Sequence, residues 1–238
     1  MIELPIAGTS QTYTVNPEKI IALGLNYKEH IEESVSVKVK GFTKEIPKEP
    51  VLFNKTPNTL CSSGDAILLP AVLEDYSFEA PRTDYEGELA VIIGKGGKFI
   101  KAANAYSHIL GYTCLNDVSQ RNIQTSDKPG WFRGKSFDTF APIGPVLVPQ
   151  ENIGNPHDLK IETRLNGNTV QSSNTKLMIF LIPEIISFVS RNFTLREGDI
   201  ISTGTPSGVG PLSPGDTVEV EIEKIGILKN SVKQEHGV

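Results

Sequence analysis

The amino-acid sequence predicts a β-rich mixed α+β fold with a few short helices, and three observations support this. Short runs rich in β-branched residues recur along the chain, the clearest being the apolar run at residues 89–93, which Gly94 closes. Gly-Asp pairs precede two later strand-like segments. Helical patterns are few and short, and they do not alternate with strands as a doubly wound Rossmann fold requires.

The composition fits one sizeable core. The chain has 238 residues, of which 38% are hydrophobic, enough for one domain with at most a small appendage. We expect residues 1–18 to form a short N-terminal strand or arm and residues 19–238 to form a single domain.

Charge and cysteine content exclude several classes of partner. The net charge of -5 comes without a basic cluster, which argues against nucleic acid. No apolar run approaches the ~20 residues that cross a bilayer, and the N-terminus lacks signal-peptide features. Cys61 and Cys114 are far apart in the sequence, so we expect free thiols, a cytoplasmic protein and no membrane association.

The first half of the chain is expected to hold mostly strands. Residues 19–27 are typical of a buried strand that runs into a turn, with a short helix beginning near Tyr27. The charged stretch 34–50 indicates a mobile loop or an edge hairpin. Strand-like pieces follow at residues 50–60 and 65–70.

The second half is expected to hold two helices and further strands. Residues 101–110 suit a helix capped by Gly111, and "GYTCLND" follows as a strand that ends in a carboxylate. Pro183 is expected to open a second helix, whose apolar face would contain Ile185, Ile186, Val189 and Phe193. Beyond it we expect only strands, including the alternating segment 218–223.

Three acidic residues attract attention. Glu86 and Glu88 lie two apart at the start of the apolar run, so on a strand their side chains share one side and repel each other. If the strand that ends at Asp117 is a neighbour, three carboxylates converge, and such oxygen donors suit Mg²⁺, Mn²⁺ or Ca²⁺. The alternative is an exposed Glu86 and a Glu88 that pairs with a lysine.

Three further features are weak evidence for a functional site when each is taken alone. His30 and Glu33 share a helical face and suit a proton-transfer pair, or an ordinary exposed pair; the stretch that follows could act as a lid or be plain surface. Lys135 would suit an enolate or carboxylate oxygen beside a metal, or lie in a surface loop. The glycine-rich segment 202–211 can offer backbone N–H groups to an anion, or serve as a turn.

Together these segments resemble the fumarylacetoacetate hydrolase family, in its small acylpyruvase and oxaloacetate decarboxylase branch. The resemblance spans roughly residues 24–230, and its most specific run ends in "TGTPSGVGP". It also rests on these segments: "GLNYKEHIEE", "DYEGELAVIIGK", "GYTCLNDVSQR", "GKSFDTFAPIGP" and "PGDTVEVEIEKIGILKN".

The resemblance implies a β-roll or mixed β-sandwich that forms a homodimer, with residues 19–238 as the catalytic domain. It implies Mg²⁺ or Mn²⁺ as cofactor, with Ca²⁺ less favoured, and the following roles. Glu86, Glu88 and Asp117 would be the metal ligands, His30 and Glu33 an acid/base dyad that activates water once the lid orders, and Lys135 the lysine that holds substrate oxygens; Arg121, Gln124 and Thr205 would bind substrate. Asn122 stands where the family often has an aspartate, which removes an expected partner for a neighbouring basic group.

The expected activity is cleavage of a small 2-oxo acid through a metal-stabilised enolate that releases pyruvate, either by acylpyruvate hydrolysis or by oxaloacetate decarboxylation. The main alternative is an isomerase, tautomerase or hydratase acting on 2-hydroxy-dienoates or oxaloacetate. A catalytically silent protein that binds a metal and an oxo acid is the alternative from another class.

Overall fold

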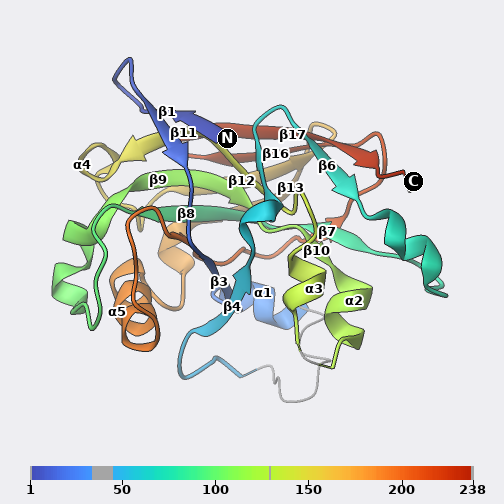
Figure 1. Cartoon of the computed structure of the whole chain (residues 1–238), viewed down its shortest axis with the longest axis horizontal. Coiled ribbons are helices and arrows are strands. Elements are labelled where there is room, and N and C mark those ends of the chain that lie inside the picture. Colours follow the sequence, from blue (N-terminus) through green and yellow to red (C-terminus); the bar gives the residue numbers. More distant parts are fainter. Residues whose placement is uncertain (1, 34–44, 129, 237–238) are drawn as a thin grey trace.

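Strands dominate the structure, a computed structural model that describes residues 2–33, 45–128 and 130–236 (Figure 1). In spatial order, the seven-stranded sheet contains β4 (Val51–Lys55), β3 (Ile20–Gly24), β14 (Ile200–Ser202), β8 (Gly87–Ile93), β9 (Ile109–Asn116), β11 (Ala141–Pro149) and β5 (Leu60–Ser62). The five-stranded sheet contains β13 (Asn168–Asn174), β12 (Lys160–Leu165), β16 (Thr217–Ile222), β17 (Gly226–Gln234) and β6 (Ala66–Leu69). The smaller sheets are β10 (Ser119–Gln120), β7 (Thr83–Tyr85) and β15 (Gly210–Pro211), and the pair β1 (Ile2–Pro5) and β2 (Thr12–Val15).

Helices in the described ranges are short. The α-helices are α1 (Lys28–Glu33), α2 (Arg121–Ser126), α3 (Phe132–Lys135), α4 (Gln150–Ile153) and α5 (Ile182–Asn192). The 3₁₀ helices are η2 (Pro57–Thr59), η3 (Ala71–Asp75), η4 (Ala102–His108) and η5 (Thr175–Leu177). No helix within these ranges has the length and apolar content to cross a membrane. The prediction of a β-rich mixed α+β fold with few short helices is confirmed.

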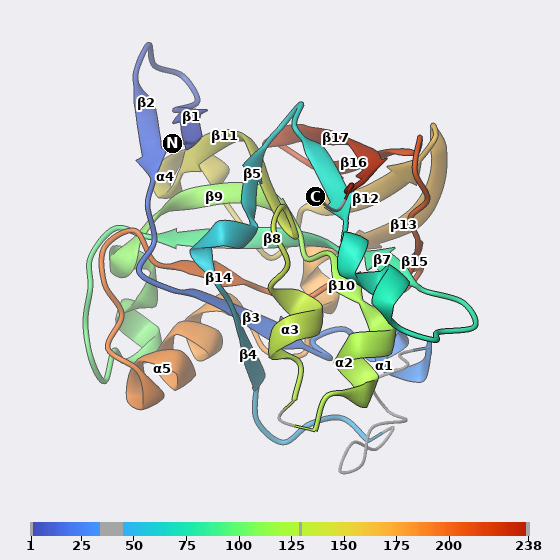
Figure 2. The ribbon, with the colours of Figure 1, turned by 45° about the vertical axis from the view of Figure 1, so that its right-hand side comes forward.

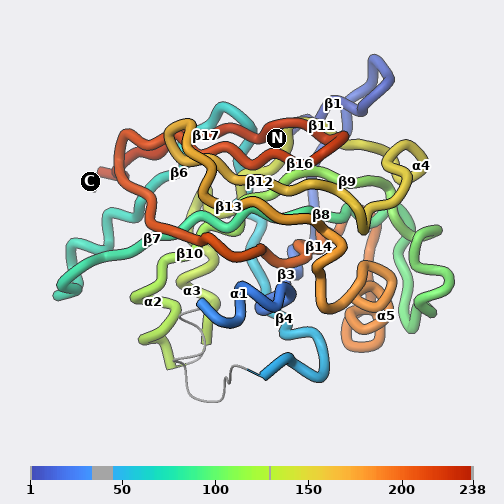
Figure 3. Tube along the Cα trace, turned by 180° about the vertical axis from the view of Figure 1, so that it is seen from behind, coloured from blue at the N-terminus to red at the C-terminus, as the bar shows by residue number. Residues whose placement is uncertain are grey.

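The main core lies between the two large sheets. Seen from behind, β12 and β16 run across β8 and β9, and these strands are in contact (Figure 3). Leu89 and Val91 of β8 face this core together with Val220 and Ile222 of β16. The alternate residues Ala90 and Ile92 point to a second cluster on the other face of the sheet. Both faces of β8 are therefore covered, which explains why its sequence is continuously apolar.

Residues 2–15 form a hairpin rather than a single strand, because β1 pairs with β2 in antiparallel register. Figure 2 shows this hairpin standing at one end of the molecule. Leu4 and Val15 join the second cluster beside Ile143 of β11, and the backbone N–H of Ala7 donates to the carbonyl oxygen of Leu147 at 2.9 Å. The hairpin thus covers part of the outer face of the large sheet.

Two local predictions were wrong. Residues 102–108 form the 3₁₀ helix η4, and Gly111 lies inside β9 instead of capping a helix. A side chain on Gly111 would come within 2.4 Å of the carbonyl oxygen of Val148, so the glycine serves a close approach of two strands. Phe193 follows the last residue of α5 and is 49% exposed, while Ile185, Ile186 and Val189 are buried as predicted. Helix α5 begins at Ile182, one residue before Pro183.

Candidate metal and oxo-acid site

Pairing of β8 with β9 brings the three predicted carboxylates together. Gly87 pairs with Asn116, so Glu86 and Glu88 flank this pair and Asp117 follows it. The backbone N–H of Asp117 donates to the carbonyl oxygen of Glu86 at 2.8 Å. One carboxylate oxygen from each of the three acidic residues lies within 4.8 Å of the others, and all three side chains are buried. This spacing suits one shared cation.

Gly87 allows the strand to approach the second sheet at this point. A side chain there would meet the Oγ1 atom of Thr163 at 2.3 Å and lie 3.3 Å from the Oε1 atom of Gln171. The residue between Glu86 and Glu88 therefore has to be small, because its face is packed against β12 and β13.

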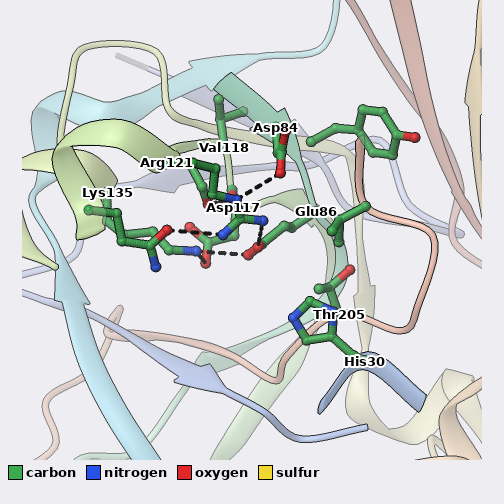
Figure 4. Close-up of polar contacts among 12 residues, drawn as sticks. His30, Asp84, Glu86, Asp117, Val118, Arg121, Lys135 and Thr205 are labelled. Carbon is green, nitrogen blue, oxygen red and sulfur yellow. Dashed lines mark hydrogen bonds and ion pairs between the residues drawn. The ribbon is translucent and has the colours of Figure 1, made fainter. Parts of the chain in front are cut away.

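Three buried cations already contact the acidic group, and Figure 4 labels two of them, Lys135 and Arg121. The Nζ atom of Lys135 lies 2.7 Å from both Glu86 Oε2 and Asp117 Oδ2. Lys55 donates to Asp117 Oδ1 at 2.7 Å, and Arg121 donates to Glu86 Oε1. Each oxygen of Glu86 and Asp117 thus has a positively charged partner, as buried carboxylates require.

These contacts set the protonation of the group. Burial by itself raises the pKa of Glu86, but Arg121 and Lys135 outweigh it and hold that pKa far below its usual value. Burial lowers the pKa of Lys135, but Asp117 and Glu86 outweigh this effect and raise it. For Lys55 burial dominates, and its pKa is lowered.

Glu88 differs from its two neighbours because no cation within residues 2–33, 45–128 and 130–236 contacts it. Its Oε2 accepts hydrogen bonds from the Ser202 hydroxyl and from the Gly204 backbone N–H, the latter at 2.8 Å. Its Oε1 is buried and has no hydrogen-bond partner among the described residues. Burial and the nearby charges of Asp117 and Glu86 raise its pKa well above the usual value. The alternative that Glu88 pairs with a lysine is therefore wrong.

The charge balance and donor set fit a hard dication. Three of the four buried carboxylates contact cations: Glu86 and Asp117 as described above, and Asp84 through Arg121 and the partly exposed Arg82, each at 2.7 Å. Glu88 is the carboxyl of this group that contacts no cation among the described residues, and its Oε1 has no hydrogen-bond partner there. A divalent cation held by Glu86, Glu88 and Asp117 would satisfy this oxygen and leave positive charge for a substrate anion.

Helices α2 and α3 place the basic side chains. Gln120 caps α2, because its side-chain oxygen accepts from the backbone N–H of Ile123 at 2.8 Å. A side chain at Gly134 would lie 2.7 Å from the backbone nitrogen of Gln124, so α3 rests directly on α2. This close contact puts Lys135, at the end of α3, beside Arg121, at the start of α2.

His30 and Glu33 lie on α1 as predicted. His30 Nδ1 and Glu33 Oε1 are 3.3 Å apart, and the same oxygen accepts from the Gly208 backbone N–H at 2.7 Å. Burial raises the pKa of Glu33, but its bonds to His30 and Gly208 outweigh this and lower it. His30 is only 5% exposed, whereas Glu33 is exposed, so one member of the pair is buried in the site and the other lies at the surface.

A pocket joins most of these groups. Its walls include seven of the nine predicted residues, namely His30, Glu86, Glu88, Arg121, Gln124, Lys135 and Thr205. Phe53 and Trp131 form an apolar side, with ring centroids 5.3 Å apart. The ammonium group of Lys135 lies 4.7 Å from the Phe53 centroid. An apolar wall beside these charges strengthens their action on a bound anion.

Several residues at this site escaped prediction from the sequence. Lys55 comes from the end of β4, far from the other site residues in the sequence, whereas Asp84 of β7 lies only two residues before Glu86 and continues the alternation of Glu86 and Glu88. Asp84 also supplies the partner of Arg121 that the asparagine at position 122 had left missing. Asn122 instead accepts from the backbone N–H of Arg82 at 2.8 Å. The predicted lid falls largely on residues 34–44, outside the described residues.

Comparison with known proteins identifies the relatives of this chain. It is 40% identical over 241 residues to a mitochondrial oxaloacetate tautomerase of Rattus norvegicus, covering 97% of this chain and 72% of the relative. The fumarylpyruvate hydrolase of Pseudomonas aeruginosa, solved with Mn²⁺ and pyruvate, is 32% identical with a TM-score of 0.84; the match covers 98% of this chain and 96% of that one. A 5-carboxymethyl-2-hydroxymuconate delta-isomerase of Mycobacterium smegmatis is 38% identical with a TM-score of 0.78, covering 93% and 78%.

These relatives are enzymes, and they include hydrolases, isomerases and tautomerases. Residues 19–233 match the family described as fumarylacetoacetate (FAA) hydrolase C-terminal. The chain therefore belongs to this family.

Proposed function

We propose that this protein hydrolyses a small acylpyruvate and releases pyruvate, with Mg²⁺ or Mn²⁺ as cofactor. The observation that carries this proposal is one pocket that combines an acidic triad, a buried lysine and a histidine with a glutamate behind it. The hydrolase relative whose structure contains Mn²⁺ and pyruvate supports the same chemistry.

Glu86, Glu88 and Asp117 would hold the metal, since their oxygens converge and Glu88 has one without a partner. The bound dication would act as a Lewis acid on the oxygens of a 2-oxo acid. Arg121 is already engaged by Asp84, Glu86 and Gln124, so we assign it to orienting Glu86 and Gln124 around the substrate carboxylate.

Lys135 and His30 would perform the remaining steps. Lys135 offers an ammonium group that can turn from its carboxylate partners to the oxygen on which negative charge develops. Glu33 accepts from His30 Nδ1, which leaves Nε2 of the neutral ring as a base toward the pocket. Water that loses a proton to this nitrogen can attack the distal carbonyl carbon of the acylpyruvate.

A second candidate is tautomerisation of oxaloacetate, which the 40% identical tautomerase favours. This reaction needs the same stabilisation of an enolate and a base such as His30, but no attacking water. Decarboxylation of oxaloacetate also needs no water. The acidic triad is therefore common to all three reactions, and only the substrate used and the product formed distinguish them.

A substrate panel tests the proposal. Acylpyruvates, oxaloacetate and 2-oxo-dienoates are assayed with Mg²⁺, with Mn²⁺ and with a chelator, following pyruvate release and ketonisation separately. We expect pyruvate release from acylpyruvates that the chelator and Glu86→Gln both abolish. Metal-dependent pyruvate release that survives Glu86→Gln would disprove the ligand assignment. Binding of Mg²⁺ and oxalate without turnover of any oxo acid would instead identify a silent binding protein.

Two expectations about the whole molecule accompany this proposal. We propose a homodimer, which light scattering on the purified protein would test. A cytoplasmic location remains a prediction from the sequence, and microscopy of the tagged protein in its own cells would check it.

A further inference from the structure

Gln171 is a buried side chain of β13 that reaches from the five-stranded sheet into the candidate site. Its Oε1 accepts from the Gly87 backbone N–H at 3.0 Å, and its Nε2 donates to the carbonyl oxygen of Pro206 at 2.9 Å. A backbone N–H can only donate and a carbonyl oxygen can only accept. These two partners therefore fix which end of the amide carries the nitrogen.

The fixed amide determines the orientation of the Thr205 hydroxyl. Gln171 Nε2 donates a second hydrogen bond to Thr205 Oγ1 at 2.9 Å. The hydroxyl hydrogen of Thr205 is in turn donated to the carbonyl oxygen of Gly87 at 2.9 Å. A hydroxyl has one hydrogen and two lone pairs. Thr205 can consequently offer a ligand one lone pair, but it has no hydrogen left to donate.

The histidine on the same pocket is also an acceptor. Glu33 Oε1 can only accept, so the hydrogen between it and His30 belongs to Nδ1, and Nε2 of the neutral ring has a lone pair. Both His30 and Thr205 line the pocket, and Figure 4 shows the ring beside the threonine. The keto form of a 2-oxo acid anion has only acceptor atoms, so neither group suits its oxygens.

We propose that Thr205, oriented by Gln171, positions the attacking water for His30. This inference rests on the proposed function and replaces the role of Thr205 as a substrate-binding residue. Water donates one hydrogen to His30 Nε2 and the other to Thr205 Oγ1. This arrangement points a lone pair of the water oxygen toward the substrate. The water oxygen bonds to the distal carbonyl carbon while its proton passes to Nε2 and the π electrons of the carbonyl move to its oxygen. When this C=O bond forms again, the distal part of the substrate leaves as a carboxylic acid. The C–C bond to the methylene then breaks, its electron pair forms the pyruvate enolate, and the proton from Nε2 completes pyruvate.

The test compares Thr205→Val with Thr205→Ser, in the full chain with Mn²⁺. Three quantities are measured: acylpyruvate hydrolysis, oxaloacetate ketonisation, and the affinity for oxalate, which resembles the anion but needs no water. We expect Thr205→Val to lower kcat for hydrolysis about 10²-fold, as expected for a misplaced reactant. Ketonisation and oxalate affinity should stay within a few-fold of wild type, and Thr205→Ser should restore hydrolysis. Gln171→Met should show the same selective loss, smaller in size.

The outcomes separate this inference from the proposed function. If Thr205→Val weakens oxalate binding and slows both reactions alike, Thr205 binds the substrate or its enol hydroxyl, and the inference is wrong. Hydrolysis that persists in Thr205→Val overturns the inference alone. A wild-type protein that ketonises oxaloacetate but hydrolyses no acylpyruvate overturns water positioning and leaves the tautomerase candidate. Inactivity on every oxo acid overturns both.

Discussion

Strand β8 and the residues just before it form an apolar half, residues 89–93, and an acidic half, Glu86 and Glu88. Both halves are buried, but one is apolar and the other carries carboxyl groups. Residues 89–93 of β8 are apolar and 0% exposed, whereas Glu86 and Glu88 just before them are 4% and 1% exposed. The apolar half is stabilised by removal of its surface from water. The acidic half is costly to bury and persists because lysine and arginine side chains from three other elements surround it. Burial alone therefore does not distinguish core from site; the partners do.

The largest effect on the free energy of unfolding is expected from a substitution in the acidic half. Lys135→Met would remove the cation shared by Glu86 and Asp117, and we expect a loss of about 3–5 kcal/mol in the free energy of unfolding without metal. Glu88→Gln is the matched variant, because it replaces a buried carboxyl that contacts no cation in the described part of the chain. Its free energy of unfolding should lie within about 1 kcal/mol of the wild-type value, or above it. Urea unfolding in a chelator measures both; an equal loss in the two variants would contradict this comparison.

In the apolar half, Leu89→Ala is expected to cost about 3 kcal/mol, because it leaves a cavity between the two sheets. The Leu89 carbonyl oxygen, which accepts from Thr203, is kept, so the loop that follows β14 should stay in place. Once folded, the variant should retain kcat within a few-fold. A large loss of kcat with unchanged stability would show that the apolar half also belongs to the site.

Gly87 lies between the halves, and Gly87→Ala should cost about 1–3 kcal/mol through overpacking. The clash would be with Thr163 Oγ1 at 2.3 Å, a hydroxyl without a hydrogen-bond partner among the described residues. Adding Thr163→Ala should recover part of the loss, since the two positions are in contact. Strictly additive losses in the double variant would exclude this clash as the cause.

The smallest effect concerns Glu33, whose pKa is lowered from its ordinary 4.5. A carboxyl with a lowered pKa adds stability above its ordinary pKa, and this contribution disappears as the pH falls through the lowered value. Glu33→Gln should therefore be less stable than wild type near neutral pH and equal to it in strong acid. Thermal unfolding across this range measures the difference; a gap that widens toward acid would contradict the assigned sign.

Local patterns in the sequence predicted the parts of the site that depend on local geometry. The spacing of Glu86 and Glu88 and the helical pair His30 and Glu33 follow from periods of two and of three to four residues, and Asp117 directly follows the predicted strand β9. The order of motifs predicted the family, which the comparison confirms.

Residues that reach the site only through tertiary pairing were not predictable in this way. Lys55 and Gln171 come from strands of two different sheets. No local pattern connects them to the acidic group. The prediction for Gly111 was wrong for the same reason. This glycine allows a close approach to β11, and the neighbouring residues in the sequence do not indicate that contact.

Crystals grown with Mn²⁺ would test the metal assignment most directly, through anomalous scattering at the manganese edge. We predict one peak about 2.1 Å from an oxygen of each of Glu86, Glu88 and Asp117. Saturating Mn²⁺ with no peak among these three carboxylates would contradict the proposed metal site.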